Sequence, residues 1–510
     1  MIEIQQYNPY PSFQSGQAEA INQILDLREM GQKVVELNAP TAAGKSLDLF
    51  VLGRVLAEEL QVGRVVYTTP LVALVNQLQE TKAFEKMPVL KGKRNYPCQV
   101  LREATGGWQS ADDCPFETWR DAIGKNPACG MCEYHKAYAK FMARDFGATT
   151  LARYQMGGAV HDETTVLLVD ESAGIEKTLI DRATLTLVER IDLEDLVPSL
   201  TLYYHDLEKE AAELDTKIDG AGDDWGRIAQ LMKAKNFAER EARKTAKVLG
   251  HIEKQHPYII DKERRFRLLD GRSEFRDLVE HLDLCVLASG TPATSIITDD
   301  YKPVIIQHPI PVEKRLCYYR PVGSMNFKER QQTAPKMAAA IADLHQKFGK
   351  KTMVHCGAYV IARMLHDNMP SSVRKYCILQ DQKEREGSKN KFLAARQAIF
   401  LSVNFEEGLD LKGPDYPLNI IAKVPFENIG DEFVKARNER DNYKRYNMHA
   451  AVAVMQAAGR CTRSVDDFSE TYILDSSWQG FFNRSRKLFQ PWFVAALRKP
   501  TEMSLEAWAQ

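Results

Sequence analysis

Short apolar segments rich in valine and isoleucine alternate with helix-like segments along the chain, and this alternation narrows the possible folds more than any other feature. Residues 34–37, 65–69 and 166–169 are three such segments in the first half of the chain. A strand that is apolar without interruption is typical of a parallel sheet covered by helices on both faces. The sequence therefore predicts an α/β fold with parallel sheets.

The same alternation returns after residue 298, in residues 352–355, 398–402 and 419–422. A chain of 510 residues is also too long for one ordinary hydrophobic core. A hydrophobic fraction of 44% and a charged fraction of 27% are typical of a folded protein and exclude wholesale disorder. We therefore predict two α/β domains, each built on its own parallel sheet.

The chain is almost neutral, with 68 Lys and Arg residues against 69 Asp and Glu residues. This balance gives no overall attraction to nucleic acid, so any such binding must use local basic patches. There is no stretch of about 18 apolar residues that would predict a membrane-spanning helix. The first residues lack the basic and apolar regions of a signal peptide. We expect a cytoplasmic or nucleoid-associated protein with no membrane partner.

Two segments interrupt the first predicted α/β domain. Residues 91–140 are polar and aromatic, carry four cysteines and have poor strand periodicity. The run between Pro198 and Pro257 contains no proline and is dominated by Glu, Lys, Ala, Leu and Arg. This composition favours long helices, and leucines at helical spacing among charges indicate a solvated helical hairpin.

Between a predicted strand and a predicted helix, residues 39–46 read Ala-Pro-Thr-Ala-Ala-Gly-Lys-Ser. They fit the phosphate-binding P-loop pattern except that Ala39 replaces the first glycine, and an ordinary strand-to-helix turn is the alternative. In a P-loop, backbone N–H groups and the helix N-terminus attract phosphate oxygens. Lys45 would reach the β- and γ-phosphates, and the Ser46 hydroxyl would hold Mg²⁺. The predicted nucleotide contacts in this loop are Ala42, Ala43, Gly44, Lys45 and Ser46.

Two carboxylates, Asp170 and Glu171, follow directly after the apolar segment 166–169. This position suits a metal-binding acid followed by a general base. Asp170 would hold Mg²⁺, and Glu171 would orient and deprotonate the attacking water. An Asp-Glu pair by itself is usually a solvated strand end, but this pair follows a P-loop pattern. It is therefore predicted to complete a hydrolytic site.

Near the end of the second predicted domain, residues 456–463 read Gln-Ala-Ala-Gly-Arg-Cys-Thr-Arg. Arg460 and Arg463, three residues apart on a helix, would share one face. Their guanidinium groups could cross the domain interface and stabilise negative charge on the transferring phosphoryl group. A pair of surface arginines is the simpler alternative.

Taken in order, these motifs resemble those of superfamily-two helicases of the XPD/DinG type over nearly the whole chain. Residues 13–17, Phe-Gln-Ser-Gly-Gln, resemble the adenine-sensing motif, with Gln17 as the reader. Residues 67–70 with Gln77 resemble motif Ia, which in this family touches the nucleic-acid backbone. The remaining matches are 287–292 to motif III, 407–410 to motif V, 424–426 to the Leu-Pro-Phe that follows it, and 456–463 to motif VI.

The resemblance implies two RecA-like motor domains with ATP between them, and it adds Asp410 and Gln456 to the nucleotide-binding residues. It also implies 5′→3′ movement of a monomeric motor on single-stranded DNA, with forked DNA and RNA–DNA hybrids as further substrates. Two positions depart from the family. Gln14 stands where many relatives carry arginine near the adenine. Ala173 replaces a histidine, and cannot make the hydrogen bonds by which that histidine links hydrolysis to DNA contacts.

Four of the nine cysteines share one window, namely Cys98, Cys114, Cys129 and Cys132. Four thiolates suit either zinc or an iron–sulfur cluster. A structural all-cysteine zinc site usually shows two close pairs, whereas the intervals here are 15, 14 and 2 residues, which favours a cluster over zinc or no metal. XPD-like helicases carry a 4Fe-4S cluster at this place in the motif order. The other five cysteines are expected to be buried apolar residues.

We therefore predict an ATP-dependent DNA helicase with ATP, Mg²⁺ and a 4Fe-4S cluster as cofactors. One alternative is a DNA translocase that remodels complexes without separating strands, and another is a DNA-binding subunit that uses ATP as a switch. The motifs fit repair and replication equally and do not choose the pathway. The predicted domains are motor domain 1 in residues 1–90, 141–180 and 266–297, a cluster domain in 91–140, a helical arch in 181–265 and motor domain 2 in 298–510.

Overall fold

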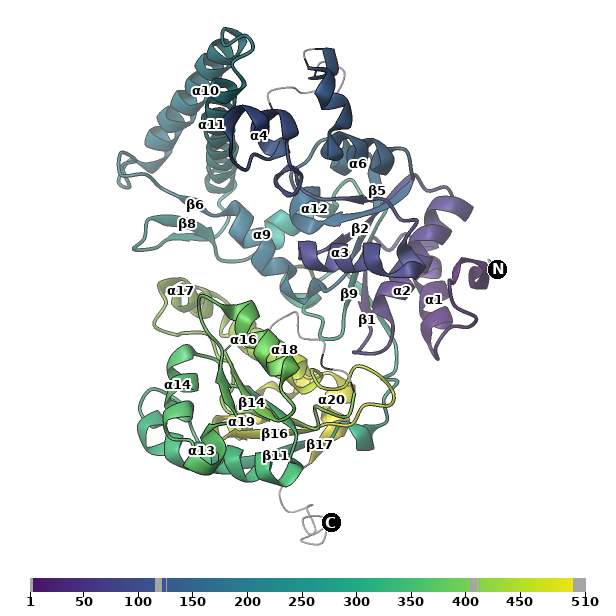
Figure 1. Ribbon diagram of the computed structural model, residues 1–510, viewed down its shortest axis with the longest axis vertical. Coiled ribbons are helices and arrows are strands. Elements are labelled where there is room, and N and C mark those ends of the chain that lie inside the picture. Colours follow the sequence, from purple (N-terminus) through teal and green to yellow (C-terminus); the bar gives the residue numbers. More distant parts are fainter. Residues whose placement is uncertain (1–2, 115–121, 125, 404–410, 412, 499–510) are drawn as a thin grey trace.

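The computed structural model describes residues 3–114, 122–124, 126–403, 411 and 413–498. Two α/β domains lie one above the other in Figure 1, and a helical hairpin stands out from the upper one. The predicted motif V, including Asp410, lies outside the described residues. Across the described ranges, no helix combines the length and the apolar character needed to span a membrane.

A sheet of seven parallel strands forms the core of the first domain, in the order β10-β1-β9-β5-β2-β4-β3. The strands are β1 (Val34–Asn38), β2 (Arg64–Thr69), β3 (Val89–Leu90), β4 (Phe146–Thr150), β5 (Thr164–Val169), β9 (Leu284–Ser289) and β10 (Lys302–Ile305). Every residue of β1 and β9 is buried, because apolar clusters cover both faces of the sheet. The predicted α/β fold is confirmed for this half of the chain.

Helices from different parts of the sequence cover the two faces of this sheet. One face carries α1 (Gln17–Glu29), α2 (Lys45–Arg54) and α3 (Val72–Glu80). The other carries α6 (Glu133–Met142), α7 (Leu151–Tyr154), α8 (Ala159–Asp162), α9 (Ile175–Ala183) and α12 (Arg272–Val279). The loops at the carboxyl ends of β1, β5 and β9 therefore emerge together at one edge, which is where parallel sheets bind ligands.

The first sheet continues past the boundary predicted at residue 298. Strand β10 pairs with β1 in parallel, with Val304 beside Leu37. Val304 and Ile306 are buried in the same apolar cluster as β1, so these side chains cover an edge that would otherwise be exposed. The assignment of residues 298–306 to the second motor domain is therefore wrong.

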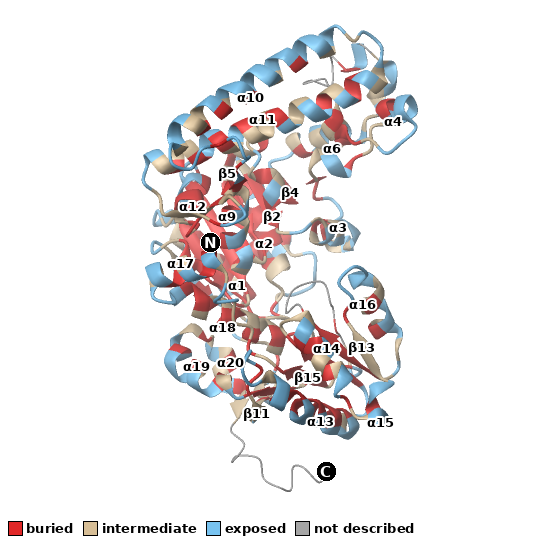
Figure 2. Ribbon diagram, turned by 90° about the vertical axis from the view of Figure 1, so that its left-hand side faces the viewer, coloured by how far each residue is buried: buried red, intermediate tan, exposed pale blue. Residues whose placement is uncertain are grey.

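The predicted helical hairpin is formed by α10 (Leu196–Asp219) and α11 (Trp225–Glu253), which run side by side in both views (Figures 1 and 2). Leucine and alanine side chains, such as Leu200, Leu207 and Ala238, fill the contact between them. A small antiparallel sheet of β6 (Leu185–Thr186), β8 (Arg265–Leu268) and β7 (Tyr258–Ile260) forms the base of the hairpin. The composition of the segment was therefore sufficient to predict its helices.

The cysteine-bearing segment lies next to this hairpin. It contains α4 (Gln99–Thr105) and several short 3₁₀ turns, and α4 lies beside α11 in both views (Figures 1 and 2). Asn236 on α11 donates a side-chain hydrogen bond to the Asp112 carbonyl oxygen at 2.6 Å. The two insertions of the first domain therefore contact each other.

A second sheet of seven parallel strands forms the other domain, in the order β13-β14-β12-β15-β16-β11-β17. The strands are β11 (Cys317–Gly323), β12 (Lys351–His355), β13 (Cys377–Leu379), β14 (Ala398–Ser402), β15 (Leu418–Ile421), β16 (Glu470–Asp475) and β17 (Leu497–Arg498). The helices are α13 (Arg330–Phe348), α14 (Tyr359–Asp367), α15 (Ser371–Arg374), α16 (Arg385–Ala394), α17 (Glu432–Asp441), α18 (Lys444–Ala458), α19 (Ser477–Ser485) and α20 (Pro491–Ala496). The chain therefore has the two RecA-like sheets that its motifs predict.

Helix α18 joins the two domains. Its Met448 and Val452 pack into the apolar cluster that covers one face of the first sheet, together with Ile175 of α9. The helix belongs to the second domain, because its other face packs against Ile421 of β15 and Ile473 of β16. Part of the interface between the two α/β domains is therefore apolar, and this part lies close to the segments that follow β5 and β9.

Candidate nucleotide-binding site and cysteine pocket

The predicted P-loop turns between β1 and α2. Gly44 directly precedes α2 and adopts a left-handed conformation with φ 80°, as does Ala42 with φ 69°. A Cβ atom on Gly44 would lie only 2.5 Å from Gln17 Nε2, so glycine is required for this close approach. Ala39, in place of the usual first glycine, is fully buried, and its N–H donates to the Ser289 carbonyl oxygen at 3.1 Å.

Gln17 supports the backbone of this loop. Its side chain is fully buried, and its Nε2 donates to the Ala43 carbonyl oxygen at 3.1 Å. Its Oε1 accepts from the Gln14 N–H at 2.7 Å. The predicted adenine reader thus lies against the phosphate-binding loop, where it ties the segment before α1 to the loop.

The two predicted hydrolytic pairs meet at the carboxyl end of β5. Lys45 Nζ lies 2.8 Å from Glu171 Oε1, and Ser46 Oγ donates to Asp170 Oδ2 at 2.8 Å. Glu171 has φ 52°, a left-handed value that is rare outside glycine and that turns the chain sharply after the strand. The structure therefore brings all four predicted residues together.

Lys45 and Glu171 stabilise each other's charged form. Burial opposes the charged form of Lys45, but the carboxylates of Glu171 and Asp170 raise the pKa of the lysine. Lys45 in turn lowers the pKa of Glu171, and Arg463 and Arg460 add to that effect. Both arginines of the second domain are therefore close enough to act electrostatically on the first domain's carboxylate.

Motif VI differs from its predicted local structure. Helix α18 ends at Ala458, so Arg460 and Arg463 lie in the turn beyond the helix and not on one helical face. A Cβ atom on Gly459 would lie 3.3 Å from Thr41 Oγ1, which shows how closely this turn packs against the P-loop. The prediction of a shared helical face is wrong, but the segment after the helix brings both charges near the P-loop and Glu171. Gln456 lies in the last turn of α18.

Two side chains in this site were missed by the sequence reasoning. Tyr67, placed in motif Ia by resemblance, is fully buried and donates its hydroxyl to Asp170 Oδ2 at 2.6 Å. It therefore orients the predicted Mg²⁺ ligand and does not face nucleic acid. Asp48, one turn after Lys45 on α2, is 1% exposed, and burial raises the pKa of its carboxyl to about 8. The sequence signal that could have identified Asp48 was an acidic residue three positions after the P-loop lysine, on the same helix.

Mg²⁺ and ATP fit the donors present at this edge. Mg²⁺ prefers carboxylate and hydroxyl oxygens, and Asp170 and Ser46 supply one of each in contact with one another. Lys45, the start of α2 and the two arginines form the positive surroundings that a triphosphate requires. The set can therefore bind and polarise a nucleotide held between the two domains.

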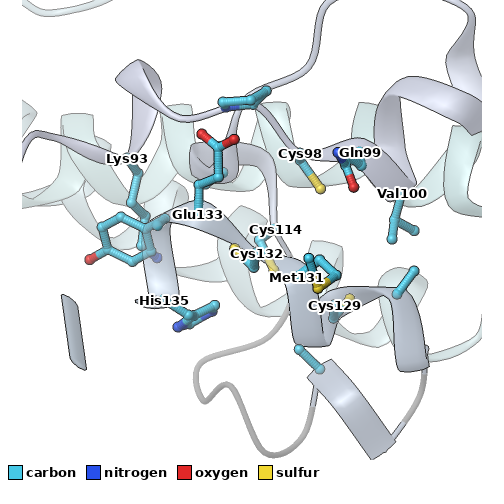
Figure 3. Close-up of a pocket in the computed structure, with 15 residues that line it drawn as sticks. Lys93, Cys98, Gln99, Val100, Cys114, Cys129, Met131, Cys132, Glu133 and His135 are labelled. Atoms are coloured by element: carbon cyan, nitrogen blue, oxygen red, sulfur yellow. The ribbon is translucent and has the colours of Figure 1, made fainter. Parts of the chain in front are cut away.

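The four clustered cysteines line a single pocket (Figure 3). Cys98 directly precedes α4, Cys114 follows a short 3₁₀ turn, Cys129 lies within another turn and Cys132 directly precedes α6. None of the four is fully buried. Cys98 and Cys132 are 34 positions apart in the sequence, and the structure places both in the lining of this pocket.

The thiols in this pocket influence one another. Burial raises the pKa of Cys98, and the neighbouring thiol of Cys132 raises it further. Burial likewise raises the pKa of Cys129, with Cys98 and Cys132 adding to the effect. Such thiols would deprotonate only with a compensating cation, so the donor set fits an iron–sulfur group. Among the described residues, however, no group of three or more His, Cys, Asp or Glu side chains is placed so that it could hold a metal ion.

The basic and aromatic side chains of residues 91–96 contact one another and the rest of the fold. Tyr96 is only 7% exposed, its hydroxyl accepts from the Lys91 N–H at 3.0 Å, and its ring packs edge-on against Tyr134. A buried ring that is committed to these contacts cannot stack on a base. Lys91 and Lys93 lie over the rings of Tyr96 and Tyr134, so the segment is held as part of the fold.

Comparison with known sequences supports a helicase relationship. Residues 341–495 match the family model of the helicase C-terminal domain. The chain is 24% identical over 169 residues to the ATP-dependent DNA helicase YoaA of Escherichia coli (strain K12), which covers 32% of this chain and 26% of that protein. It is 26% identical over 144 residues to the ATP-dependent helicase DinG of Mycobacterium tuberculosis (strain ATCC 25177 / H37Ra), which covers 27% and 22%. The matches span about a quarter of the length of these relatives.

Comparison with solved structures supports the fold over nearly the whole chain. The structure titled S. tokodaii Xpd4 has a TM-score of 0.58 at 13% identity, covering 95% of this chain and 100% of that one. A second structure, titled XPD helicase, has a TM-score of 0.60 at 14% identity, covering 96% and 100%. At such low identity the likeness establishes the arrangement of the domains and insertions, not the chemistry.

Proposed function

We infer that this chain is a superfamily-two helicase of the XPD/DinG type, and that it hydrolyses ATP to move along single-stranded DNA and unwind duplexes. One observation carries the proposal. The lysine of the P-loop, the carboxylates after β5 and the arginines after α18 converge from two domains on the same cleft. ATP and Mg²⁺ are expected for a helicase, and this cleft offers them complementary charges.

Each residue would have a separate role in hydrolysis. Lys45 would neutralise the β- and γ-phosphates, while Ser46 and Asp170 would hold Mg²⁺, which when bound screens the phosphate charge. Glu171 would accept a proton from the attacking water as the new bond forms to the γ-phosphorus and the bond to the bridging oxygen breaks. Arg460 and Arg463 would stabilise the charge on the transferring group.

Binding of a nucleotide requires Glu171 to release Lys45. The lysine cannot hold a phosphate and a carboxylate with the same strength, so the phosphates would displace Glu171 toward the water. Closure of the cleft would then add the two arginines. Hydrolysis would reverse the sequence, and the alternation of the two domain positions would move the strand.

We propose that the strand moves in the 5′→3′ direction and that its substrates are single-stranded and forked DNA, with RNA–DNA hybrids as a further class. The direction rests on the resemblance to the XPD/DinG type. The cysteine pocket beside α11 supports a 4Fe-4S cluster held by Cys98, Cys114, Cys129 and Cys132. A cluster there would fix the cysteine-bearing segment against the helical hairpin, where a duplex could be split.

Unwinding assays on 5′-tailed, 3′-tailed and hybrid duplexes, with anaerobically purified protein, test the whole proposal. We expect displacement of the 5′-tailed strand that depends on ATP. Translocation without displacement would support the remodelling alternative, for which Ala173 is the motivating residue. ATP binding without DNA-stimulated turnover would instead support the switch subunit and contradict the roles of Glu171, Arg460 and Arg463.

A further inference from the structure

A buried ionic cluster, made of residues other than those of the nucleotide site, joins the two α/β domains. Glu176, in the first turn of α9, is 2% exposed and accepts a hydrogen bond from Arg445 Nε at 2.7 Å. Arg445 is the second residue of α18 and is 6% exposed. A buried contact between opposite charges from two domains costs desolvation, so it is retained only where its partners are well placed.

The three nitrogens of the Arg445 guanidinium group are all engaged. Besides Glu176, they donate to the Ile296 carbonyl oxygen at 2.7 Å and to Asp441 Oδ2 at 3.1 Å. Ile296 belongs to the first motor domain and follows β9, whereas Asp441 precedes α18. Arg445 is therefore fixed to two separate segments of the first domain by directional hydrogen bonds.

His449, one turn further along α18, completes the cluster. Its Nε2 lies 3.5 Å from Glu176 Oε2, and its Nδ1 lies 3.4 Å from Glu427 Oε1. Glu427 in turn pairs with the buried Arg437. Burial opposes ionisation of Glu176, but His449 and Arg445 hold the pKa of that carboxyl below its usual range. The carboxylate is therefore charged and is held by two side chains from the same face of α18.

The cluster and the nucleotide site share the same two chain segments. Glu176 follows Glu171 by five positions, with only one 3₁₀ turn, η7 (Ser172–Gly174), between them. Arg445 stands at the start of α18, and Arg460 lies just beyond its end. A helix of this length is a rigid rod of about 22 Å, so its position at one end sets the position of the other.

We propose that Glu176 is a positioning residue for the arginines of motif VI. By holding Arg445 and His449, it fixes the start of α18 on the segment that carries Glu171, and the helix then places Arg460 and Arg463 in the cleft. This inference rests on the proposed function, because it assigns the cluster a part in ATP hydrolysis. Without the anchor, α18 would still pack through Met448 and Val452, but its axial position would no longer be defined.

The test uses the full chain and compares Glu176→Gln and His449→Gln with the wild type. We expect kcat of the DNA-stimulated ATPase to fall about tenfold to a hundredfold, since small displacements of catalytic groups have effects of that size. KM for ATP and the affinity for a non-hydrolysed ATP analogue should change little, because Lys45 and the P-loop stay intact. If Glu176→Gln does not fold, His449→Gln tests the same cluster, because His449 contacts Glu176.

The matched control is Glu274→Gln. Glu274 is 5% exposed and is also held by a lysine and a histidine, Lys247 and His251, but all three lie outside the interface between the motor domains. We expect it to lower the melting temperature and to leave kcat per folded molecule unchanged. An equal loss of kcat in Glu274→Gln would overturn the inference, because general destabilisation would then explain it.

Three further outcomes distinguish the inference from the proposed function on which it rests. Wild-type kcat in both Glu176→Gln and His449→Gln would overturn the positioning role while leaving the proposed helicase intact. A wild-type protein with no DNA-stimulated ATPase would overturn the proposed function itself. A fall in kcat with unchanged nucleotide affinity, seen in the cluster variants and not in Glu274→Gln, would support the inference.

Discussion

Lys45 Nζ lies 2.8 Å from Glu171 Oε1, so the cation that would hold the nucleotide and the carboxylate that would activate water neutralise each other. Each shifts the pKa of the other toward its charged form. A nucleotide phosphate would compete with Glu171 for Lys45, and its arrival would free the carboxylate. In the proposed mechanism, the pair would therefore link nucleotide binding to activation of the base.

Removing either partner of this pair should reduce ATP turnover, but through different steps. Lys45→Ala should weaken ATP binding, whereas Glu171→Gln should bind ATP and lower kcat by about 10²-fold to 10⁴-fold, the usual contribution of a general base. Steady-state ATPase with single-stranded DNA, together with nucleotide-binding titrations, measures the two effects. Glu58→Gln, in a partly exposed ion pair with Arg54, is the control. Turnover retained in Glu171→Gln would reject its assignment as base.

Tyr67→Phe should raise the Mg²⁺ requirement of the ATPase. The substitution keeps the buried ring but removes the hydroxyl that donates to Asp170 at 2.6 Å. Loss of such an outer contact usually costs about tenfold to a hundredfold in metal affinity. The measurement is the Mg²⁺ concentration for half-maximal ATPase. Tyr154→Phe, another buried tyrosine of the first domain, should leave it unchanged; an equal shift in both variants would argue against a specific role for Tyr67.

Asp48→Asn should stabilise the protein more as the pH rises. Burial raises the pKa of Asp48 to about 8 from 3.8, so the folded chain binds the extra proton and the wild type loses stability as the pH rises toward 8. Each unit of pKa shift corresponds to about 1.4 kcal/mol. Melting temperatures compared from about pH 5 to about pH 8 should show a growing advantage for Asp48→Asn. Asp26→Asn, at an exposed position, should show none; a pH-independent difference would contradict the buried proton.

Cys129→Ser should harm unwinding more than ATPase. If the four cysteines hold a 4Fe-4S cluster, anaerobic wild-type protein should be brown, with about four irons and four sulfides per chain. The variant should lose the colour and the strand displacement while keeping DNA-stimulated ATPase, because the pocket lies in an insertion apart from the cleft. Cys377→Ser, in the second α/β domain, is the control. Zinc without sulfide would overturn the cluster, and equal loss of both activities would indicate misfolding.

Much of the fold could be predicted from local patterns. The continuous apolar segments predicted two parallel sheets, because such strands are stable only when both faces are covered. The proline-free charged run predicted α10 and α11 from composition alone. The boundary at 298 could not be placed, since Val304 pairs with a strand that is more than 250 positions earlier and no local signal records that contact.

The sequence by itself predicted Lys45, Asp170, Glu171 and the four clustered cysteines as candidate site residues, because their motifs and their clustering can be recognised without knowledge of tertiary contacts. Only the tertiary structure decided how they work together. Tyr67 turns to Asp170, Arg460 and Arg463 lie beyond the helix end, and Glu176 meets Arg445 across the domain interface. These relationships depend on burial and on contacts between distant segments, and packing fixes them after the chain has folded.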